Sequence, residues 1–347
     1  MNKIKVVFAG HDLKFAKLII DYLELTGDYS VRLDEWKGHN VHDERHSKEC
    51  LEWADLIVCE WGLGNAVWYS ENKLPRQKLI VRMHLQEVQT VYPKQFNLEN
   101  IDRIIAISPY VYEEFYRVFK LPRDKMTMIY NVVDTEIMNQ TKEEDSKFHL
   151  GFIGMSPKRK RLDLAVDVLE KLWEQDSRYK LFIKGKLPQE YPWLWNKEDE
   201  REYYEELFSR INNAPWKDAV VFDGFGSDIA GWLRKIGYVL STSDFESFHL
   251  SPSEGAASGA FPLILKWDGS DTIYPKDYLF ESVDDIVLRV KEINGSNLNN
   301  ELGEQAKQYV RKHFSVEEIG GNWDLLMKEL CRERNMADET TMNTVEN

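Results

Sequence analysis

Residues 151–172 read GFIGMSPKRKRLDLAVDVLEKL and join three kinds of segment in direct succession. The apolar run GFIG is followed by a short basic loop, and then by apolar residues at helical spacing. A strand that passes through a tight turn into a helix is the repeating unit of parallel α/β sheets. This stretch therefore predicts a parallel sheet with helices packed on its faces.

The same alternation extends along the chain. The other candidate strands are KVVFAG, SVRLD, LIVCEW, LIVRMH, RIIAIS and TMIYNVV in the first half, and YKLFIKG, AVVFDGF, IGYVLST and FPLILKW in the second. The polar stretch at 139–147 has no apolar period and indicates a linker between the two series. We therefore predict an α/β protein with two doubly wound, Rossmann-like domains, at 1–147 and 148–312. Ligands bind at the carboxyl ends of such strands, so the two domains are expected to face each other across a cleft.

The end of the chain is expected to form a helix over 313–335 that crosses back to the first domain. Trp323, Leu325 and Leu326 are predicted to pack there. The last residues, 336–347, are polar and are predicted to form a disordered tail.

Composition limits the function. The 347 residues carry a net charge of −14, which argues against a nucleic-acid partner. Three cysteines without metal-ligand spacing fit a reducing cytoplasm, and we expect neither a metal nor a cofactor. No signal peptide is apparent, and no apolar run reaches the roughly 18 residues that cross a bilayer. The prediction is a cytoplasmic protein, and peripheral contact with the inner face of a membrane stays compatible with it.

Two glutamates stand in ESFHLSPSE, residues 246–254. Glu246 follows the apolar run of an expected strand, at the end where such folds carry out chemistry, although a solvated loop residue is the alternative. Glu254 completes a capping box with Ser251, so helix capping is its alternative role. Small residues follow at 256–258, and they allow an anion to approach the helix start.

The basic run KRKR at 158–161 lies where a strand passes into a helix. Fixed cations there suit a leaving group that develops negative charge, whereas a solvated surface is the alternative. His84 ends LIVRMH and is either a site residue or a structural histidine. Gly10 follows KVVFA at the first expected turn.

These segments, in this order, resemble family 4 of the retaining GT-B glycosyltransferases. The resemblance rests on the glutamate pair, on GFIGMSPKRKRLDLAVDVLEKL, LFIKGK and VVFDGF, and on DRIIAISPYVYEEF and YNVVD. It implies a metal-independent, retaining hexosyltransferase that moves a sugar from a nucleotide-sugar donor, UDP- or GDP-type, to a glycan or glycolipid acceptor. Bacterial surface polysaccharide or glycoconjugate assembly is the implied pathway.

The resemblance also assigns residues. Glu246 and His84 would lie beside the donor sugar as catalytic residues, and Glu254 would hold the ribose. The remaining donor-binding residues would be Gly10, Gly154, Arg159, Lys160, Phe248, His249 and Leu250, the last three through backbone amides. Either Arg159 or Arg161 would assist Lys160, because Met155 replaces the usual arginine. Ser247 and His249 replace usual glycines, which places the fit of the sugar in question.

Three alternatives stay open. The chain could be another GT-B enzyme, such as a sugar phosphorylase or a sugar-nucleotide epimerase, or a non-catalytic sugar-nucleotide-binding subunit. The aromatic insert at 186–216 is expected to anchor itself through Tyr191, Trp193 and Trp195, with stacking on a sugar acceptor as the alternative.

Overall fold

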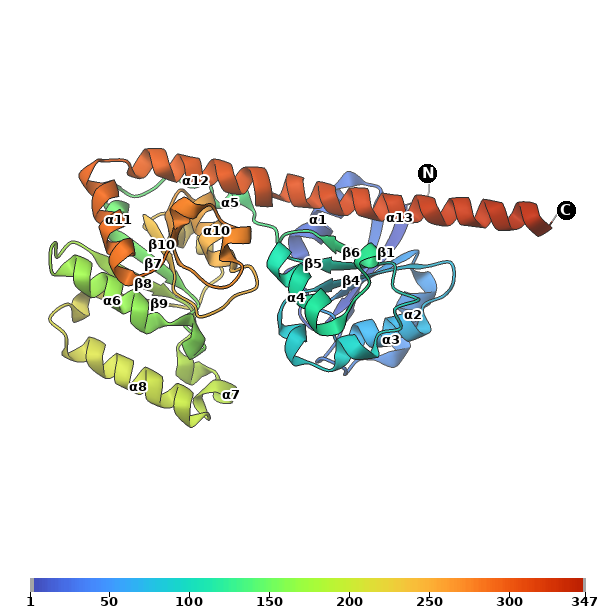
Figure 1. The fold of residues 1–347 in the computed structure, drawn as a ribbon, viewed down its shortest axis with the longest axis horizontal. Coiled ribbons are helices and arrows are strands. Elements are labelled where there is room, and N and C mark those ends of the chain that lie inside the picture. The colour runs from blue at the N-terminus through green and yellow to red at the C-terminus, as the bar shows by residue number, and fades with distance from the viewer. Residues whose placement is uncertain (1–2, 346–347) are drawn as a thin grey trace. The chain divides into compact units, whose positions relative to one another are not determined.

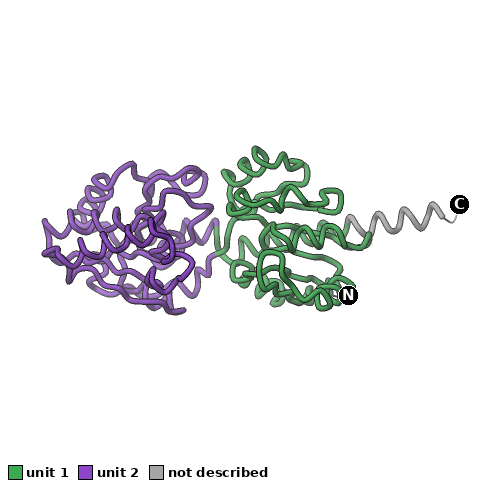
Figure 2. Tube along the Cα trace, turned by 90° about the horizontal axis from the view of Figure 1, so that it is seen from below, with its two compact units in different colours: residues 1–132, 314–347 green, residues 133–313 purple. Residues whose placement is uncertain are grey.

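The computed structural model describes residues 3–345, with side chains described to residue 332. The chain forms two compact units, coloured separately in Figure 2: residues 1–132 with 314–347, and residues 133–313. The boundary lies before the polar stretch that was expected to be a linker. Lys142 explains the difference, because its ammonium group donates to the carbonyl oxygens of Leu233 and Ile236 and so fixes this stretch to unit 2.

Unit 1 is built on a parallel six-stranded sheet with the order β2-β1-β3-β4-β5-β6 (Figure 1). Its strands are β1 Ile4–Gly10, β2 Tyr29–Glu35, β3 Leu56–Glu60, β4 Lys78–Met83, β5 Arg103–Ala106 and β6 Met126–Met128. Its helices are α1 Lys17–Thr26, α2 Glu44–Trp53, α3 Gly64–Asn72, α4 Pro109–Phe119 and α13 Val316–Val345. Each strand confirms a predicted apolar run, although β6 ends well before the end of TMIYNVV.

Helices α1 and α13 cover one face of this sheet. Phe8 and Val58, which alternate along their strands with residues of the other face, share a buried core with Trp323 and Leu326 of α13. Leu325 was expected in this core but is 66% exposed, because it lies on the opposite side of α13 from Trp323 and Leu326. The prediction of a disordered tail at 336–347 was wrong for most of its length, because α13 continues to Val345, and residues 346–347 lie outside the described residues.

Unit 2 contains a second parallel sheet, with the order β12-β11-β10-β7-β8-β9. Its strands are β7 His149–Ile153, β8 Lys180–Lys184, β9 Val220–Gly224, β10 Tyr238–Ser241, β11 Phe261–Leu265 and β12 Leu279–Phe280. Its helices are α5 Thr135–Met138, α6 Leu162–Trp173, α7 Pro192–Trp195, α8 Glu198–Asn213, α9 Ile229–Leu233, α10 Leu250–Ala257, α11 Val283–Gly295 and α12 Asn299–Phe314. The two-residue strand β12 was not predicted.

The aromatic insert forms α7 and α8, and its expected anchors Tyr191 and Trp195 are half-buried. Its buried side chains include those of Leu194, Tyr204, Leu207, Ile211 and Trp216. Trp193 is 59% exposed, so it does not anchor the insert. Within residues 3–345, no helix is both long and apolar enough to cross a membrane.

Candidate functional site

The site in unit 2 forms where two loops meet at the carboxyl ends of β7 and β10, which are neighbours in the sheet. The Thr242 hydroxyl donates to the carbonyl oxygens of Lys160 and Arg161, and the Asp244 amide donates to that of Arg159. These bonds tie the basic run to the loop after β10. They bring Lys160 beside Glu246.

Glu246 is a buried, paired carboxylate with 8% exposure. Its Oε1 accepts from Lys160 Nζ and from Ser243 Oγ at 2.8 Å, and lies 3.3 Å from Arg159 Nη1. Burial alone would raise the pKa of Glu246, but His249, Lys160 and Arg159 together lower it to about 2. Its Oε2 accepts no hydrogen bond from the described residues. Glu246 is therefore an ionised group with one open oxygen, and a solvated loop residue is excluded.

The basic run divides into two pairs with different partners. Lys160 and Arg159 approach Glu246, and the Lys160 side chain is only 15% exposed. Arg161 instead contacts Asp163 and Asp244, at 2.9 and 3.1 Å. Lys158 likewise pairs with an acidic side chain, that of Asp199. Of the two arginines, Arg159 is thus the one that accompanies Lys160.

Helix α10 begins at Leu250, two residues earlier than the predicted capping box requires. Ser251 lies inside the helix and makes no side-chain cap bond, so the capping prediction was wrong. Glu254 lies further along the helix and is half-buried, without an ion pair or side-chain hydrogen bond in the described part of the chain. Burial raises its pKa to about 7. Glu254 lies inside the helix, beyond the N-cap residue His249, so capping does not explain this residue.

The residues before α10 are held by the Tyr274 hydroxyl, which donates to the carbonyl oxygens of Phe248 and His249. The side chain of Phe248 is fully buried. His249 has φ 58°, a left-handed conformation that favours glycine. This conformation explains why the resembling family has glycine here. The His249 Nδ1 lies 2.7 Å from Ser241 Oγ, whereas its buried Nε2 has no hydrogen-bond partner; burial lowers its pKa to about 3.

A cavity of about 180 Å³ opens in unit 2 at the ends of β7, β8 and β9. Lys184 and Lys186 line it together with Tyr191 and Phe225. Gly154 also lines it and has φ 78°, so the turn after β7 requires glycine. Tyr191 of the insert thus forms a cavity wall.

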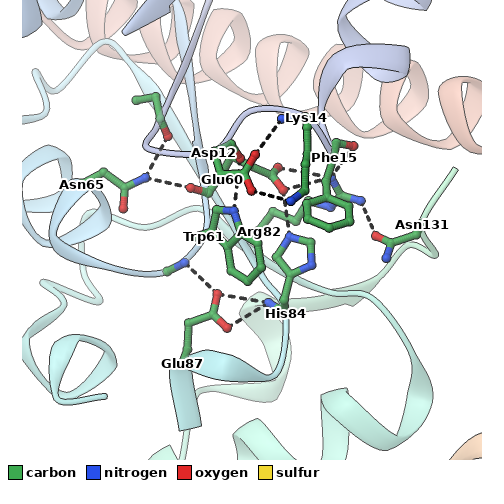
Figure 3. Close-up of polar contacts among 12 residues, drawn as sticks. Asp12, Lys14, Phe15, Glu60, Trp61, Asn65, Arg82, His84, Glu87 and Asn131 are labelled. Carbon is green, nitrogen blue, oxygen red and sulfur yellow. Dashed lines mark hydrogen bonds and ion pairs between the residues drawn. The ribbon is translucent and has the colours of Figure 1, made fainter. Parts of the chain in front are cut away.

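In unit 1, His84 follows β4 and joins a buried polar cluster (Figure 3). Its Nε2 lies 2.8 Å from Glu60 Oε1, and Arg82 Nη1 lies 3.2 Å from both oxygens of Glu60. Arg82 Nη2 donates to Asn131 Oδ1 at 2.6 Å. The indole of Trp61 lies against the imidazole, with 3.9 Å between ring centroids. Burial raises the pKa of Glu60, but Arg82 and His84 outweigh burial and lower it.

Gly10 is the last residue of β1, which pairs with β3. A Cβ at Gly10 would be 2.6 Å from the carbonyl oxygen of Glu60, so no side chain fits there. The glycine is explained by close packing of β1 against β3. It is not in a flexible turn of positive φ.

Sequence reasoning missed Glu60, Arg82 and Asn131. A signal was present, since Glu60 and Arg82 end two consecutive apolar runs that were predicted to be buried strands. In the sheet these two residues are register partners on β3 and β4. Asn131 gives no such signal, because it lies in an irregular segment after β6.

Several solved structures have a fold similar to that of this chain. HepE of Anabaena, solved with UDP and glucose, is 14% identical with a TM-score of 0.69, covering 94% of this chain and 100% of its own. A glycosyltransferase of Rickettsia africae is 15% identical with a TM-score of 0.73, covering 96% and 99%. Sucrose-phosphate synthase of Thermosynechococcus elongatus is 16% identical with a TM-score of 0.70, covering 94% and 99%. No curated protein matches the sequence.

These likenesses establish the GT-B fold, with one Rossmann-like sheet in each unit. Among the described residues, no group of three or more His, Cys, Asp or Glu could hold a metal ion. The family of glycosyl transferases group 1 matches residues 133–311, which is more than half of the chain and nearly all of unit 2. The chain belongs to this glycosyltransferase family.

Proposed function

We propose that the protein is a retaining, metal-independent glycosyltransferase of family 4 that takes its sugar from a nucleoside diphosphate. The observation that carries the proposal is the pairing of Lys160 and Arg159 with Glu246. Two cations face one carboxylate, which leaves one positive charge for an incoming diphosphate. Positive charge at this point stabilises the diphosphate as the glycosidic bond breaks.

Glu246 serves the other side of the same bond. The sugar develops oxocarbenium character as the nucleotide leaves, and a carboxylate with one open oxygen stabilises that charge. A low pKa keeps Glu246 ionised at every physiological pH. An ionised group without a second carboxylate beside it suits charge stabilisation and does not suit the acid role of a hydrolase.

We assign the other proposed site residues to the donor according to the part of the fold in which each lies. Glu254 accepts hydrogen bonds from the ribose, and the backbone of residues 248–250 with Gly154 contacts the sugar and diphosphate. In unit 1, His84 contacts the donor sugar, and Gly10 keeps the backbone at the end of β1 free of side chains. UDP is the preferred nucleotide, since HepE was solved with UDP-glucose and GtfA, of similar fold, with UDP and GlcNAc.

The acceptor is proposed to be a glycan or glycolipid of bacterial surface polysaccharide or glycoconjugate assembly. The enzyme would act in the cytoplasm, with peripheral contact at the inner membrane face. The acceptor class is best tested after the donor is known.

The experiment is a thermal-shift panel of UDP-, GDP- and ADP-sugars, followed by nucleotide release with candidate acceptors. Specific binding raises the melting temperature by mass action. NMR of the product at the anomeric carbon tests retention, and assays with EDTA test metal independence. Turnover that depends on inorganic phosphate would indicate a phosphorylase. Conversion of the sugar on the nucleotide into its epimer would indicate an epimerase. Binding without turnover would indicate a non-catalytic subunit.

A further inference from the structure

Glu60, Arg82 and His84 form a charged cluster in the interior of unit 1. Glu60 and Arg82 are fully buried, and His84 is 2% exposed. Replacing a buried ion pair with apolar residues is often neutral or stabilising, so such a pair is weak evidence of a role in stability. The cluster therefore points to a role in placing a functional group.

The hydrogen bond between Glu60 and His84 selects one form of the imidazole. An ionised carboxylate only accepts hydrogen bonds, so the proton of this bond belongs to His84 Nε2. In the neutral ring, the lone pair then lies on Nδ1. Nδ1 has no hydrogen-bond partner among the described residues, and it is not one of the fully buried polar atoms without a partner. It therefore keeps some solvent-accessible area, within a side chain that is 3% exposed.

The ring is also held on its faces and through its backbone. The indole of Trp61 lies 3.9 Å from the imidazole, and the phenyl ring of Phe15 lies 5.2 Å from it, both between centroids. The carboxylate of Glu87 accepts from the backbone amide of His84 at 3.0 Å. Trp61 has φ 67°, a conformation that costs energy in a large residue and persists only where its surroundings enforce it. Figure 3 shows these groups around the imidazole.

We propose that Glu60 is a positioning residue that holds His84 as the Nε2–H tautomer, so that Nδ1 accepts a hydrogen bond from a hydroxyl of the donor sugar. The inference rests on the proposed function, in which His84 contacts that sugar. A neutral acceptor suits this place, because the sugar becomes more positive as the bond breaks and an imidazolium would oppose that charge.

The tautomer is measured directly by long-range ¹H–¹⁵N NMR of the histidine side chains at pH 8. The chain has eight histidines, so a His84→Gln spectrum assigns the His84 signals. We expect a protonated Nε2 and an unprotonated Nδ1 in the wild-type protein. The reverse tautomer, or a doubly protonated ring, would overturn the proposal. This measurement needs neither a substrate nor a stable variant at Glu60.

Glu60→Gln tests the consequence for activity. The amide keeps the shape but loses the charge, so both tautomers should become populated. Turnover of UDP-glucose should fall by roughly 10- to 100-fold, by analogy with the loss seen when the partner that orients a metal-bound histidine is removed. Affinity for UDP, which lacks the sugar, should change by less than about 2-fold. A folded variant with an unchanged tautomer and turnover would contradict the proposal.

Asp34→Asn provides the matched control. Asp34 is also a buried carboxylate of unit 1, but it accepts from Trp36, Ser47 and Tyr69 and makes no contact with Glu60. This variant should leave the His84 spectrum and the turnover of UDP-glucose unchanged. If the wild-type protein binds neither UDP nor UDP-glucose, the assigned donor fails, whereas the spectrum still decides whether Glu60 sets the tautomer.

Discussion

The ammonium group of Lys160 donates to the carboxylate of Glu246, a residue 86 positions further along the chain. Burial lowers the pKa of Lys160, and Glu246 opposes this shift. The cation and the anion of the proposed donor site therefore depend on each other. A substitution at either residue changes the charge around the other, so binding, turnover and stability need to be measured together.

Glu246→Gln should lower turnover by at least about 10²-fold, because its charge acts on the sugar mainly in the transition state. Such a loss corresponds to roughly 2.7 kcal/mol, which one electrostatic contact can supply. UDP affinity should stay within a few-fold or increase. Without the negative charge of Glu246, Lys160 and Arg159 are free to interact with the phosphates of UDP. Calorimetric titration with UDP and single-turnover rates on one preparation measure both quantities.

The same variant should be less stable by about 1–3 kcal/mol, because two buried or half-buried cations lose a charged partner. Urea unfolding of unit 2 measures this cost. Full turnover in a folded Glu246→Gln protein would remove this residue from the reaction and leave it a structural counter-ion of Lys160.

Lys160→Ala should weaken UDP binding by at least about tenfold and leave uridine binding almost unchanged, because its partner in the site is phosphate charge. Lys158→Ala is the matched control: it lies in the same basic run but pairs with Asp199 on the surface. Isothermal titration of both variants with UDP and uridine makes the comparison. Equal effects at the two lysines would mean that the basic run acts only through its overall positive charge, and that Lys160 makes no specific contact with the phosphates.

Trp323→Ala should destabilise unit 1 by about 3–5 kcal/mol, because this fully buried indole fills the core between α13 and the sheet. Leu325→Ala, two residues away and 66% exposed, should change stability by less than about 0.5 kcal/mol. Thermal or urea unfolding of the two variants gives the difference. Similar losses in both would mean that α13 does not contribute through its buried face.

The parallel sheets could be predicted because strands that are buried on both faces consist of consecutive apolar residues. KVVFAG, LIVCEW and LIVRMH became β1, β3 and β4 almost residue for residue. The positions of Glu246 and Lys160 could also be predicted, because each follows a strand at its carboxyl end, whereas their roles in a donor site stay a prediction. Local rules failed at α10, where Ser251 and Glu254 fit a capping box, yet His249 begins the helix in a left-handed conformation that no local pattern signals.

Contacts between residues far apart in the sequence could not be predicted, even where the residues themselves gave a signal. Glu60 and Arg82 become an ion pair only through the register of β3 with β4, which the sequence does not specify. Similarly, nothing in KRKR distinguishes Arg159 from Arg161. Their difference arises because Asp163 and Asp244 occupy only Arg161.

Glu254 should make the stability of unit 2 depend on pH. Burial raises its pKa from 4.5 in the unfolded chain to about 7 in the folded protein. Between these values the folded state holds a proton that the unfolded chain has released, so stability falls as pH rises from 4.5 to about 7. Glu254→Gln resembles the protonated form and should remove this dependence. At pH 8 the variant should be more stable than the wild type by about 1–3 kcal/mol, and at pH 4.5 the difference should vanish.

Urea unfolding of both proteins at pH steps from 4.5 to 8 measures the difference in their free energies of unfolding. The other titrating groups are common to both proteins, so their contributions cancel in this difference. UDP provides a second test, because ribose hydroxyls that donate to Glu254 favour its ionised form. UDP should therefore stabilise the wild type more at pH 8 than at pH 6, relative to the variant. The comparison with the variant also removes the effect of phosphate titration, because that effect is the same in both proteins. A difference that stays constant with pH, with and without UDP, would show that Glu254 is neither desolvated in the free protein nor in contact with the nucleotide.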